Sequence, residues 1–490
     1  MDILLKIVQT VNSYLTDYVL IFLLIGVGIL FTVRTRFVQV RCFGQGMKLV
    51  FGKISLRGKK EGGGLSSFQA LATAIAAQVG TGNIVGACGA ILVGGPGAIF
   101  WMWVIAFFGM ATIYAEAVLA QKTRVVDAEG NVQGGPVYYI KAVFKGNLGK
   151  ILAGFFAVST VLALGFMGAM VQSNSVAESF NNAFSIPTWV VGLAVAALAG
   201  AVFLGGVRRL AAVTEKLVPI MAVLYILGSL VVIFARIQYI PETFGMIFKY
   251  AFNANALIGG GIGFALKQAI SQGAKRGLFS NEAGMGSTPH AHALAEVKHP
   301  HEQGCTAMIG VFIDTFIVLT MTALVVISTL YAGGGALANS LSYNAADGGL
   351  IESVSKLFSK TNLAQQAFGT VFGTTFGNVF VAVCLFFFAF STILSWNLFG
   401  KLNMQYLFGK KSIPAYLVVA VGFVFLGSLF QNDFVWELTD FFNYLMVIPN
   451  VIALVALSAV VAKAMPAKKD ACCLPSDAVN PVTESEKSAE

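Results

Sequence analysis

The chain has 490 residues, of which 57% are hydrophobic and only 11% are charged, far below the share of about 25% that is typical of soluble domains. This composition excludes a soluble globular enzyme, a disordered chain and a fibrous repeat. The length allows about eight to twelve membrane-spanning helices of about 20 apolar residues each. The 53 glycines also stand out, because glycine marks places where a membrane helix breaks or where two helices touch.

Apolar runs of membrane length predict an all-α polytopic membrane protein with about 11 transmembrane helices. No segment has the composition of a separate soluble domain. In chain order, the expected helices lie at residues 18–33, 68–93, 96–120, 151–180, 187–205, 217–235, 255–279, 304–330, 366–398, 413–430 and 434–462.

The net charge of +9 arises from 32 Lys and Arg against 23 Asp and Glu. If the N-terminus lies outside, most of these cations fall in cytoplasmic segments, as the positive-inside rule requires. This count places Lys275 and Arg276 in a cytoplasmic loop. The charge then belongs to the cytoplasmic face of the protein, so it gives no reason to expect nucleic-acid binding. The polar C-terminus is expected to be a cytoplasmic, disordered tail.

Two predicted spans carry glycine clusters near their middles, Gly80 and Gly82 in one and Gly259–Gly263 in the other. Each glycine costs a helix about 1 kcal/mol, so the clusters are expected to unwind. Unwound backbone at membrane depth occurs only where it is buried in protein or lines a cavity. The alternative is helix packing, because Gly259 and Gly263 themselves form a G-x-x-x-G pair.

The clusters open two successive sets of five spans, and five is odd, so the second set enters the membrane from the opposite side. Such an inverted repeat with broken helices is typical of secondary transporters, whose substrate sites lie at the membrane midplane. The predicted divisions are an extra N-terminal helix with a cytoplasmic loop (1–64), a first five-helix repeat (65–236), a second five-helix repeat (237–462) and the tail (463–490).

Three motifs, QVGTGNIVG (78–86), GGPGAIFWMWVIAFFG (94–109) and NEAGMGSTPHAHA (281–293), resemble stretches of the bacterial sodium:alanine/glycine symporters. The resemblance covers nearly the whole chain. It implies a LeuT-type 5+5 inverted repeat plus one helix, and Na⁺-coupled symport of alanine, glycine and similar small neutral amino acids. It also implies a multi-pass protein of the cell inner membrane that is not an enzyme. Its partners would be the amino acid, the coupling Na⁺ and the lipid bilayer, with no obligate protein partner evident.

The first break supplies the main candidate residues. A half-helix N-terminus favours a carboxylate, and the resemblance places the substrate carboxylate against the backbone of Thr81 and Gly82. Gln78 is expected to face substrate or ion, although a polar contact between helices is the alternative. By residue chemistry and resemblance together, the substrate-binding candidates are Gln78, Gly80, Thr81, Gly82, Gln172, Gly259, Gly260, Gly261, Phe264 and Trp396.

The later members of that set have specific expected roles. The resemblance makes Gln172 a substrate contact. Carbonyl groups of Gly259–Gly261 are expected to accept the substrate ammonium, with Phe264 covering the substrate side chain. Trp396 either walls the substrate pocket or packs in the core. A tight pocket favours a small side chain, and the choice among alanine, glycine, serine and glutamine stays open.

Ser391 and Thr392 are adjacent hydroxyls within an apolar helix. Such hydroxyls often bond to the carbonyl four residues earlier in their own helix. In LeuT-type transporters a hydroxyl pair at this position binds sodium together with carbonyls of the first broken helix. The resemblance therefore implies a sodium site made by Ala76, Val79, Asn83, Ser391 and Thr392. No other metal is expected.

Ionisable residues within predicted spans are costly and mark function by default. Asp314 is expected to pair with Lys267, to help bind a second ion or to carry a proton. A proton-coupled amino-acid transporter of the same fold is therefore the alternative function. Glu116 is expected at the membrane interface. All four histidines lie within 290–301, in a predicted cytoplasmic loop that contributes an inner gate rather than a metal site.

Overall fold

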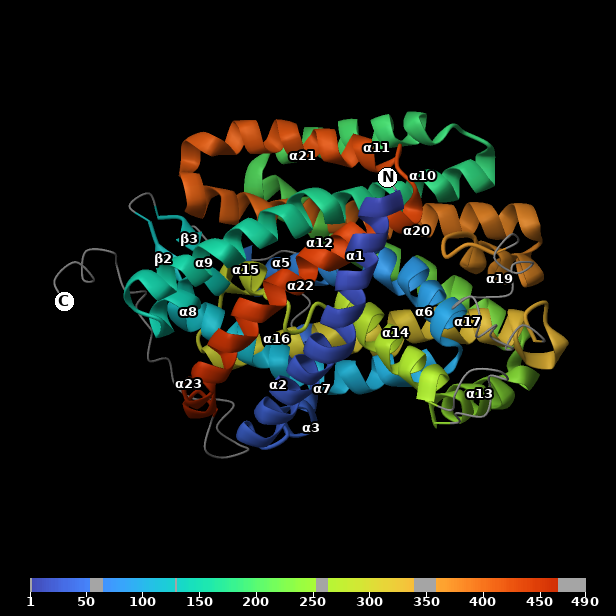
Figure 1. Ribbon diagram of the computed structural model, residues 1–490, viewed down its shortest axis with the longest axis horizontal. Coiled ribbons are helices and arrows are strands. Elements are labelled where there is room, and N and C mark those ends of the chain that lie inside the picture. Colours follow the sequence, from blue (N-terminus) through green and yellow to red (C-terminus); the bar gives the residue numbers. More distant parts are fainter. Residues whose placement is uncertain (1, 53–64, 128–129, 253–262, 339–357, 466–490) are drawn as a thin grey trace.

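The computed structural model describes residues 2–52, 65–127, 130–252, 263–338 and 358–465, and these are almost entirely helical (Figure 1). Within the described residues, eight helices are long and apolar enough to cross a membrane, and one bent pair makes a ninth span. The polytopic all-α fold is therefore confirmed. Part of the seventh predicted span, at 255–262, lies outside the described residues, so the number of about 11 helices stays a prediction.

The chain begins with a long helical run that precedes both repeats. Its apolar part spans Ile3–Arg34, which contains the predicted extra helix at 18–33. A turn then leads into two short helices. In order, these elements are α1 Asp2–Tyr14, the π-helical η1 Leu15–Leu20, α2 Ile21–Arg34, α3 Val38–Arg41 and α4 Phe43–Phe51. In Figure 1, α1 lies along α22, a helix from the far end of the chain.

The first predicted repeat opens with the bent pair, whose halves are inclined by 42°. Helices α9, η3 and α10 form one continuous run of 39 residues. The elements are β1 Leu65–Ser66, α5 Ser67–Gln78, η2 Gly82–Gly86, α6 Ala87–Gly94, α7 Gly97–Thr123, β2 Val125–Val126, β3 Val132–Gln133, α8 Pro136–Val143, α9 Gly146–Thr160, η3 Val161–Gly168, α10 Ala169–Phe184, α11 Thr188–Phe203 and α12 Gly206–Ala235.

The second predicted repeat contains α20, a helix of 35 residues. The predicted span at 366–398 crosses a helix boundary at Gly373, where φ is +81°. The described elements are η4 Ile237–Tyr239, α13 Ile240–Phe252, α14 Gly263–Asn281, α15 Pro289–Ala293, β4 Ala295–Glu296, α16 Pro300–Val311, η6 Phe312–Leu319, α17 Thr320–Leu330, η7 Ala332–Gly334, α19 Asn362–Phe372, α20 Thr374–Phe408, η8 Lys410–Ser412, α21 Ile413–Gly427, α22 Asn432–Ala456 and α23 Ser458–Lys463.

The described residues contain two very short β pairings, and one of them connects distant segments. β1 pairs in parallel with β4, so the strand that leads into α5 lies beside the strand that follows α15. β2 and β3 form an antiparallel pair. Ser66, in β1, also starts α5 with a capping box, because its hydroxyl accepts from Gln69 N–H and the Gln69 side chain accepts from Ser66 N–H. The pairing of β1 with β4 thus places α5 and α15 at the same end of the molecule.

Candidate functional site

The first predicted break is confirmed. Helix α5 ends at Gln78 and helical structure resumes at Gly82, so residues 79–81 interrupt the span. The backbone groups released there find side-chain acceptors. Gly80 N–H donates to Asn83 Oδ1 at 3.0 Å, and Thr81 N–H donates to Gln172 Oε1 at 3.1 Å. Gln172 comes from α10, so a polar side chain of another helix caps the open end of the break.

Close packing explains the glycine at position 80. A Cβ atom there would lie 2.4 Å from Thr392 Oγ1 and 3.2 Å from Gln172 Oε1. Any other residue would have to push aside the hydroxyl or the amide that surround the break. Gly82 is similarly constrained, since a Cβ would lie 3.0 Å from Ser280 Cα. The glycines therefore permit the first break to lie directly against α10, α14 and α20.

The described residues place a second break further along the chain than the sequence analysis does. Helix α14 runs without interruption from Gly263 to Asn281. The backbone then leaves the helical conformation, with positive φ at Glu282, Gly284 and Gly286, until α15 begins at Pro289. This break falls in the motif that the sequence analysis assigns to a gate. The predicted site residues Gly259, Gly260 and Gly261 and the Phe264 side chain lie outside the described part of the chain.

Two buried carboxylates hold the second break in place. Glu116 on α7 accepts from Gly284 N–H at 3.1 Å, from Gly286 N–H at 3.0 Å and from Asn450 Nδ2 at 2.6 Å. Its side chain is fully buried within the protein, and its position at the membrane interface stays a prediction. Glu282 accepts from the Trp396 indole at 2.5 Å and from the Ser287 hydroxyl. The interaction with Glu116 satisfies amide groups that no helix would otherwise satisfy.

The two breaks face each other at the centre of the bundle. Gln78, the last residue of α5, donates from Nε2 to the backbone carbonyl of Asn281, the last residue of α14, at 2.8 Å. The Phe279 ring lies between Gly82 and Trp396, in edge contact with the indole at 5.7 Å. Gln78 and Trp396 therefore both belong to the central cluster, together with Asn281 and Phe279, which the sequence analysis did not select.

The predicted hydroxyl pair also reaches the first break. Thr392 Oγ1 lies 2.8 Å from the carbonyl oxygen of Ala76 and 3.1 Å from that of Phe388 in its own helix. Ser391 Oγ bonds locally to Phe388 O at 2.9 Å and lies 3.4 Å from Met221 Sδ. Thr392 thus bridges α20 and α5. The Ser391 hydroxyl instead donates to a carbonyl of its own helix, which is the alternative that the sequence analysis names.

Asp314 lies beside the first break and is fully buried. It accepts from Asn83 Nδ2 at 2.6 Å, from Ser280 Oγ at 2.9 Å and from Thr315 Oγ1 at 2.7 Å. Asn83 in turn orients its oxygen toward Gly80 N–H. A carboxylate, an amide oxygen and two hydroxyls from three separate segments therefore meet here, and such oxygen atoms are the ligands that hard cations prefer.

The predicted pairing of Asp314 with Lys267 is wrong. Lys267 Nζ lies 2.7 Å from Asp17 Oδ2, and its side chain is 51% exposed. The partner is a residue of η1 rather than of η6. Lys267 is located near the start of α14, whereas Ser280, at the other end of that helix, contacts Asp314. The length of α14 separates Lys267 from the site.

Several buried polar atoms around the breaks have no hydrogen-bonding partner among the described residues. They are Gln78 Oε1, Thr81 Oγ1 and Gln172 Nε2. A buried polar atom without a partner costs about 1–3 kcal/mol, so such atoms in one place indicate a site for a polar ligand. All three belong to residues that the sequence analysis selects as substrate contacts.

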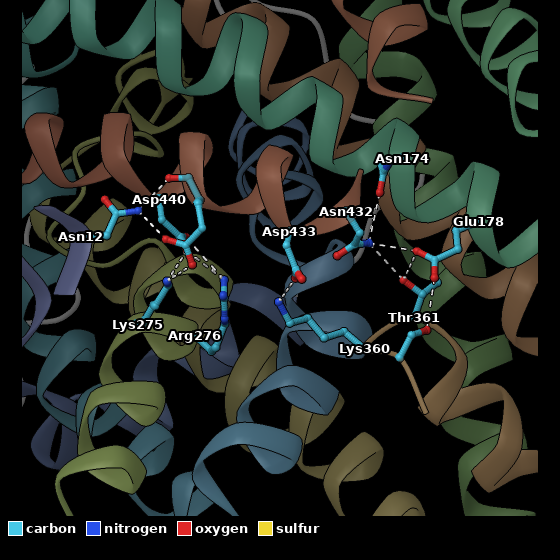
Figure 2. A network of polar contacts seen from close by, with 12 residues as sticks. Asn12, Asn174, Glu178, Lys275, Arg276, Lys360, Thr361, Asn432, Asp433 and Asp440 are labelled. Carbon is cyan, nitrogen blue, oxygen red and sulfur yellow. Dashed lines mark hydrogen bonds and ion pairs between the residues drawn. The ribbon is translucent and has the colours of Figure 1, made fainter. Parts of the chain in front are cut away.

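A layer of ion pairs and amide contacts connects α22 to its neighbours (Figure 2). Asp440 on α22 lies 2.9 Å from Lys275 Nζ and 3.3 Å from Arg276 Nη1, both on α14. The count that put Lys275 and Arg276 in a cytoplasmic loop is therefore wrong for these two residues. The Arg276 guanidinium also stacks on Trp436 at 4.5 Å, and Trp436 contacts Phe279 at 4.6 Å. This layer therefore connects to the aromatic wall of the site.

The histidines do not form a cluster in the structure. His290 contacts Asn403 and the carbonyl of Ser287, and His292 contacts Gln303. His301 contacts Tyr114 at 2.7 Å, on a different helix. The sequence analysis did not select Phe279, Ser280, Asn281 or Glu282, and it gave Glu116 a different role. The signal for Asn281 and Glu282 was the run of polar residues and glycines at 281–287, which resembles the first break more closely than an ordinary loop does.

Two breaks that meet inside a helical bundle define a secondary transporter of the LeuT type. The solved structure of MhsT in complex with L-phenylalanine shares this fold, with a TM-score of 0.58 over 84% of this chain and 94% of that chain. The sequences are only 13% identical, so this likeness concerns the fold.

The chain belongs to the sodium:alanine symporter family, whose sequence model matches residues 1–470. It is 41% identical to the sodium/alanine symporter AgcS of Methanococcus maripaludis, over 93% of this chain and 95% of that protein. The putative sodium/proton-dependent alanine carrier protein YrbD of Bacillus subtilis is 39% identical, over 92% of this chain and 90% of that protein. The probable sodium/glutamine symporter GlnT of the same organism is 37% identical, over 95% of this chain and 90% of that protein. The family is one of membrane transporters rather than enzymes.

Proposed function

We propose that this protein is a Na⁺-coupled symporter that imports alanine, glycine and similar small neutral amino acids by alternating access. The observation that carries the proposal is the bridge from Thr392 Oγ1 to the Ala76 carbonyl, 2.8 Å apart, beside the amides of the first break, whose acceptors are side chains rather than helix carbonyls. A hydroxyl and a carbonyl from the two repeats offer oxygen ligands to Na⁺. The amides one turn further offer donors to a carboxylate.

In this proposal Gln172 exchanges its partner when substrate binds. Its Oε1 accepts from Thr81 N–H, where a substrate carboxylate oxygen would accept instead. Its Nε2 has no partner among the described residues and would then donate to that carboxylate. Phe279 and Trp396 would cover the substrate side chain, a role that the sequence analysis gave to Phe264. The carbonyls of the second break at 281–287 are the proposed acceptors for the ammonium group.

Sodium would bind at Thr392 and Ser391 with the carbonyls of Ala76 and Val79, and at Asn83 beside Asp314. Joint binding of ion and amino acid would stabilise one occluded state, in which α5 and α14 stay in contact through Gln78 and Asn281. Inward movement of one Na⁺ gains about 2.3 kcal/mol per 100 mV of membrane potential. This gain would drive uptake against a substrate gradient.

The test is uptake of radiolabelled alanine, glycine, serine and glutamine into proteoliposomes. An inward Na⁺ gradient should drive accumulation of alanine and glycine, and accumulation should stop when Li⁺, K⁺ or choline replaces Na⁺. Equal uptake in all four media, without a pH gradient, would contradict sodium coupling. Preference for glutamine would contradict the proposed substrate class while leaving the coupling ion intact.

A proton-coupled transporter of the same fold is the second candidate, and one observation favours it. Asp314 is a fully buried carboxyl group at the site, and none of its contacts among the described residues is with a basic residue. A pH gradient should then drive uptake without Na⁺. Asp314→Asn would abolish that uptake, whereas Thr392→Ala would leave it intact. Under sodium coupling, by contrast, both Asp314→Asn and Thr392→Ala should lower Na⁺-driven uptake.

We also propose that the N-terminus lies outside and the C-terminus in the cytoplasm. The support is the concentration of Lys and Arg in one set of loops, which remains after Lys275 and Arg276 are removed from the count. Labelling of single cysteines introduced near residue 2 and near residue 463 with a membrane-impermeant reagent in intact cells tests this. The first position should react and the second should not.

A further inference from the structure

Two cysteines and a histidine from distant parts of the chain meet outside the transport site. Cys42 lies between α3 and α4, whereas His301 and Cys305 lie one turn apart on α16. The exposed fractions of the three side chains are 8%, 6% and 0%. Their ligand atoms all lie within 4.8 Å of one another, and His301 Nε2 lies 3.5 Å from Cys305 Sγ.

The close approach of two helices brings these groups together. Gly46 on α4 lies against α16, since a Cβ there would be 2.9 Å from the carbonyl oxygen of Cys305. One residue earlier, Gln45 directs its Oε1 to within 3.3 Å of His301 Nε2 and 3.9 Å of Cys305 Sγ. An amide oxygen is therefore available beside the two thiols and the imidazole.

A further contact fixes the orientation of the imidazole. Tyr114 on α7 places its hydroxyl 2.7 Å from His301 Nδ1. This leaves His301 Nε2 directed toward Cys305 and Gln45. Histidines that bind metals in proteins nearly always have the second ring nitrogen held in this way by a neighbouring group.

The spacing and charge of the cluster suit zinc. Tetrahedral Zn²⁺ with Zn–S of about 2.3 Å and Zn–N of about 2.0–2.1 Å has ligand atoms about 3.5–3.8 Å apart, which matches His301 Nε2 and Cys305 Sγ. Soft thiolate ligands select Zn²⁺ or Cu⁺ over Na⁺ and Mg²⁺. Two thiolates and a neutral imidazole balance a divalent cation, and a neutral assembly is the least costly one to bury.

We propose that Cys42, His301 and Cys305 bind one Zn²⁺, with Gln45 Oε1 as the fourth ligand. Binding forms two Zn–S bonds, one Zn–N bond and one Zn–O bond, and the two thiol protons leave to solvent. The metal would fasten α4, and with it the segment after the first helix, to α16. Since α16 continues into η6, which carries Asp314, the zinc would hold the cytoplasmic end of a helix that reaches the transport site. The proposal does not depend on the transported substrate.

Zinc content of the intact, tag-free protein purified in detergent under reducing conditions tests the proposal. Elemental analysis should find about one zinc per chain, and Cys42→Ser, Cys305→Ser and His301→Gln should each lower the zinc content at least about tenfold at a fixed chelator concentration. Cys88→Ser is the matched control, because Cys88 is equally buried in α6 and distant in sequence from the cluster, and it should keep its zinc.

A second measurement uses only the wild-type protein and therefore tests the proposal even if the variants fail to fold. Wild-type protein stripped of metal should bind Co²⁺ in place of Zn²⁺ and develop a sulfur-to-cobalt charge-transfer absorption, which added Zn²⁺ should remove. Wild-type protein that binds neither metal would overturn the proposal. So would a Cys42–Cys305 disulfide in freshly purified protein, copper in place of zinc, or equal zinc loss in the Cys88→Ser control.

Discussion

Thr392 and Ala76 are 316 residues apart in the sequence, yet the threonine hydroxyl lies 2.8 Å from the alanine carbonyl oxygen. One residue belongs to the long helix α20 and the other to the last turn of α5 before the first break. The contact therefore joins the two predicted repeats at the point where α5 loses its regular hydrogen bonds. The first two predictions below, on Thr392 and Gly80, depend on this arrangement.

Removal of the Thr392 hydroxyl should weaken sodium binding. An interaction with a charged partner contributes about 1.5–3 kcal/mol, so Thr392→Ala should raise the half-saturating Na⁺ concentration by about tenfold to a hundredfold. Thr392→Ser keeps the hydroxyl and should stay within a few-fold of wild type. The measurement is the Na⁺ dependence of alanine uptake in proteoliposomes. Unchanged Na⁺ dependence in Thr392→Ala would remove this hydroxyl from the ion site.

A methyl group at position 80 should stop transport. In Gly80→Ala the Cβ atom would lie 2.4 Å from Thr392 Oγ1, so the hydroxyl must leave its place beside the break. Uptake should fall by at least about tenfold while the protein still reaches the membrane. Gly154→Ala on α9 is the control, because no atom lies within 4 Å of the added Cβ, and it should transport normally. Full activity in Gly80→Ala would contradict the close packing described at the break.

Loss of the Glu116 carboxylate should destabilise the second break. Glu116→Ala leaves the amides of Gly284 and Gly286 without acceptors, each at a cost of about 1–3 kcal/mol. The apparent melting temperature in detergent should fall clearly. Glu302→Gln, in the first turn of α16, should melt close to wild type. If both variants have the same apparent melting temperature, the hydrogen bonds that Glu116 accepts from the second break contribute nothing to stability.

Two aspartates on α22 allow a matched comparison of buried and exposed ion pairs (Figure 2). Asp440→Asn leaves the buried Arg276 without its counter-charge, while Lys275 keeps its pair with Glu437, and the loss at Arg276 should cost about 3–5 kcal/mol. The side chain of Asp433 is 67% exposed, so loss of its pair with Lys360 in Asp433→Asn should cost about 0–1 kcal/mol. The measurement is the melting temperature of both variants, which should fall more in Asp440→Asn than in Asp433→Asn. A larger fall in Asp433→Asn would contradict the prediction.

The amino-acid sequence by itself determined the fold class and the place of the first break. Long apolar runs require helices in a bilayer, because lipid leaves no other partner for the backbone. The glycines at 80 and 82 indicated the first break, and this signal is local, so one chain without coordinates is enough to read it. The hydroxyls at 391 and 392 were expected as its partner only because of the resemblance to the symporter family.

Only the tertiary structure decided which distant groups meet. The second break lies at 282–288, where the sequence suggested a loop, because Glu116 on α7 and Trp396 on α20 satisfy backbone and carboxylate groups that no local pattern predicts. Lys267 pairs with Asp17 rather than with Asp314, since the length of α14 separates it from the site. Cys42 joins His301 because α4 packs on α16 through Gly46. Such contacts depend on the packing of helices, which the periodicity of one chain does not encode.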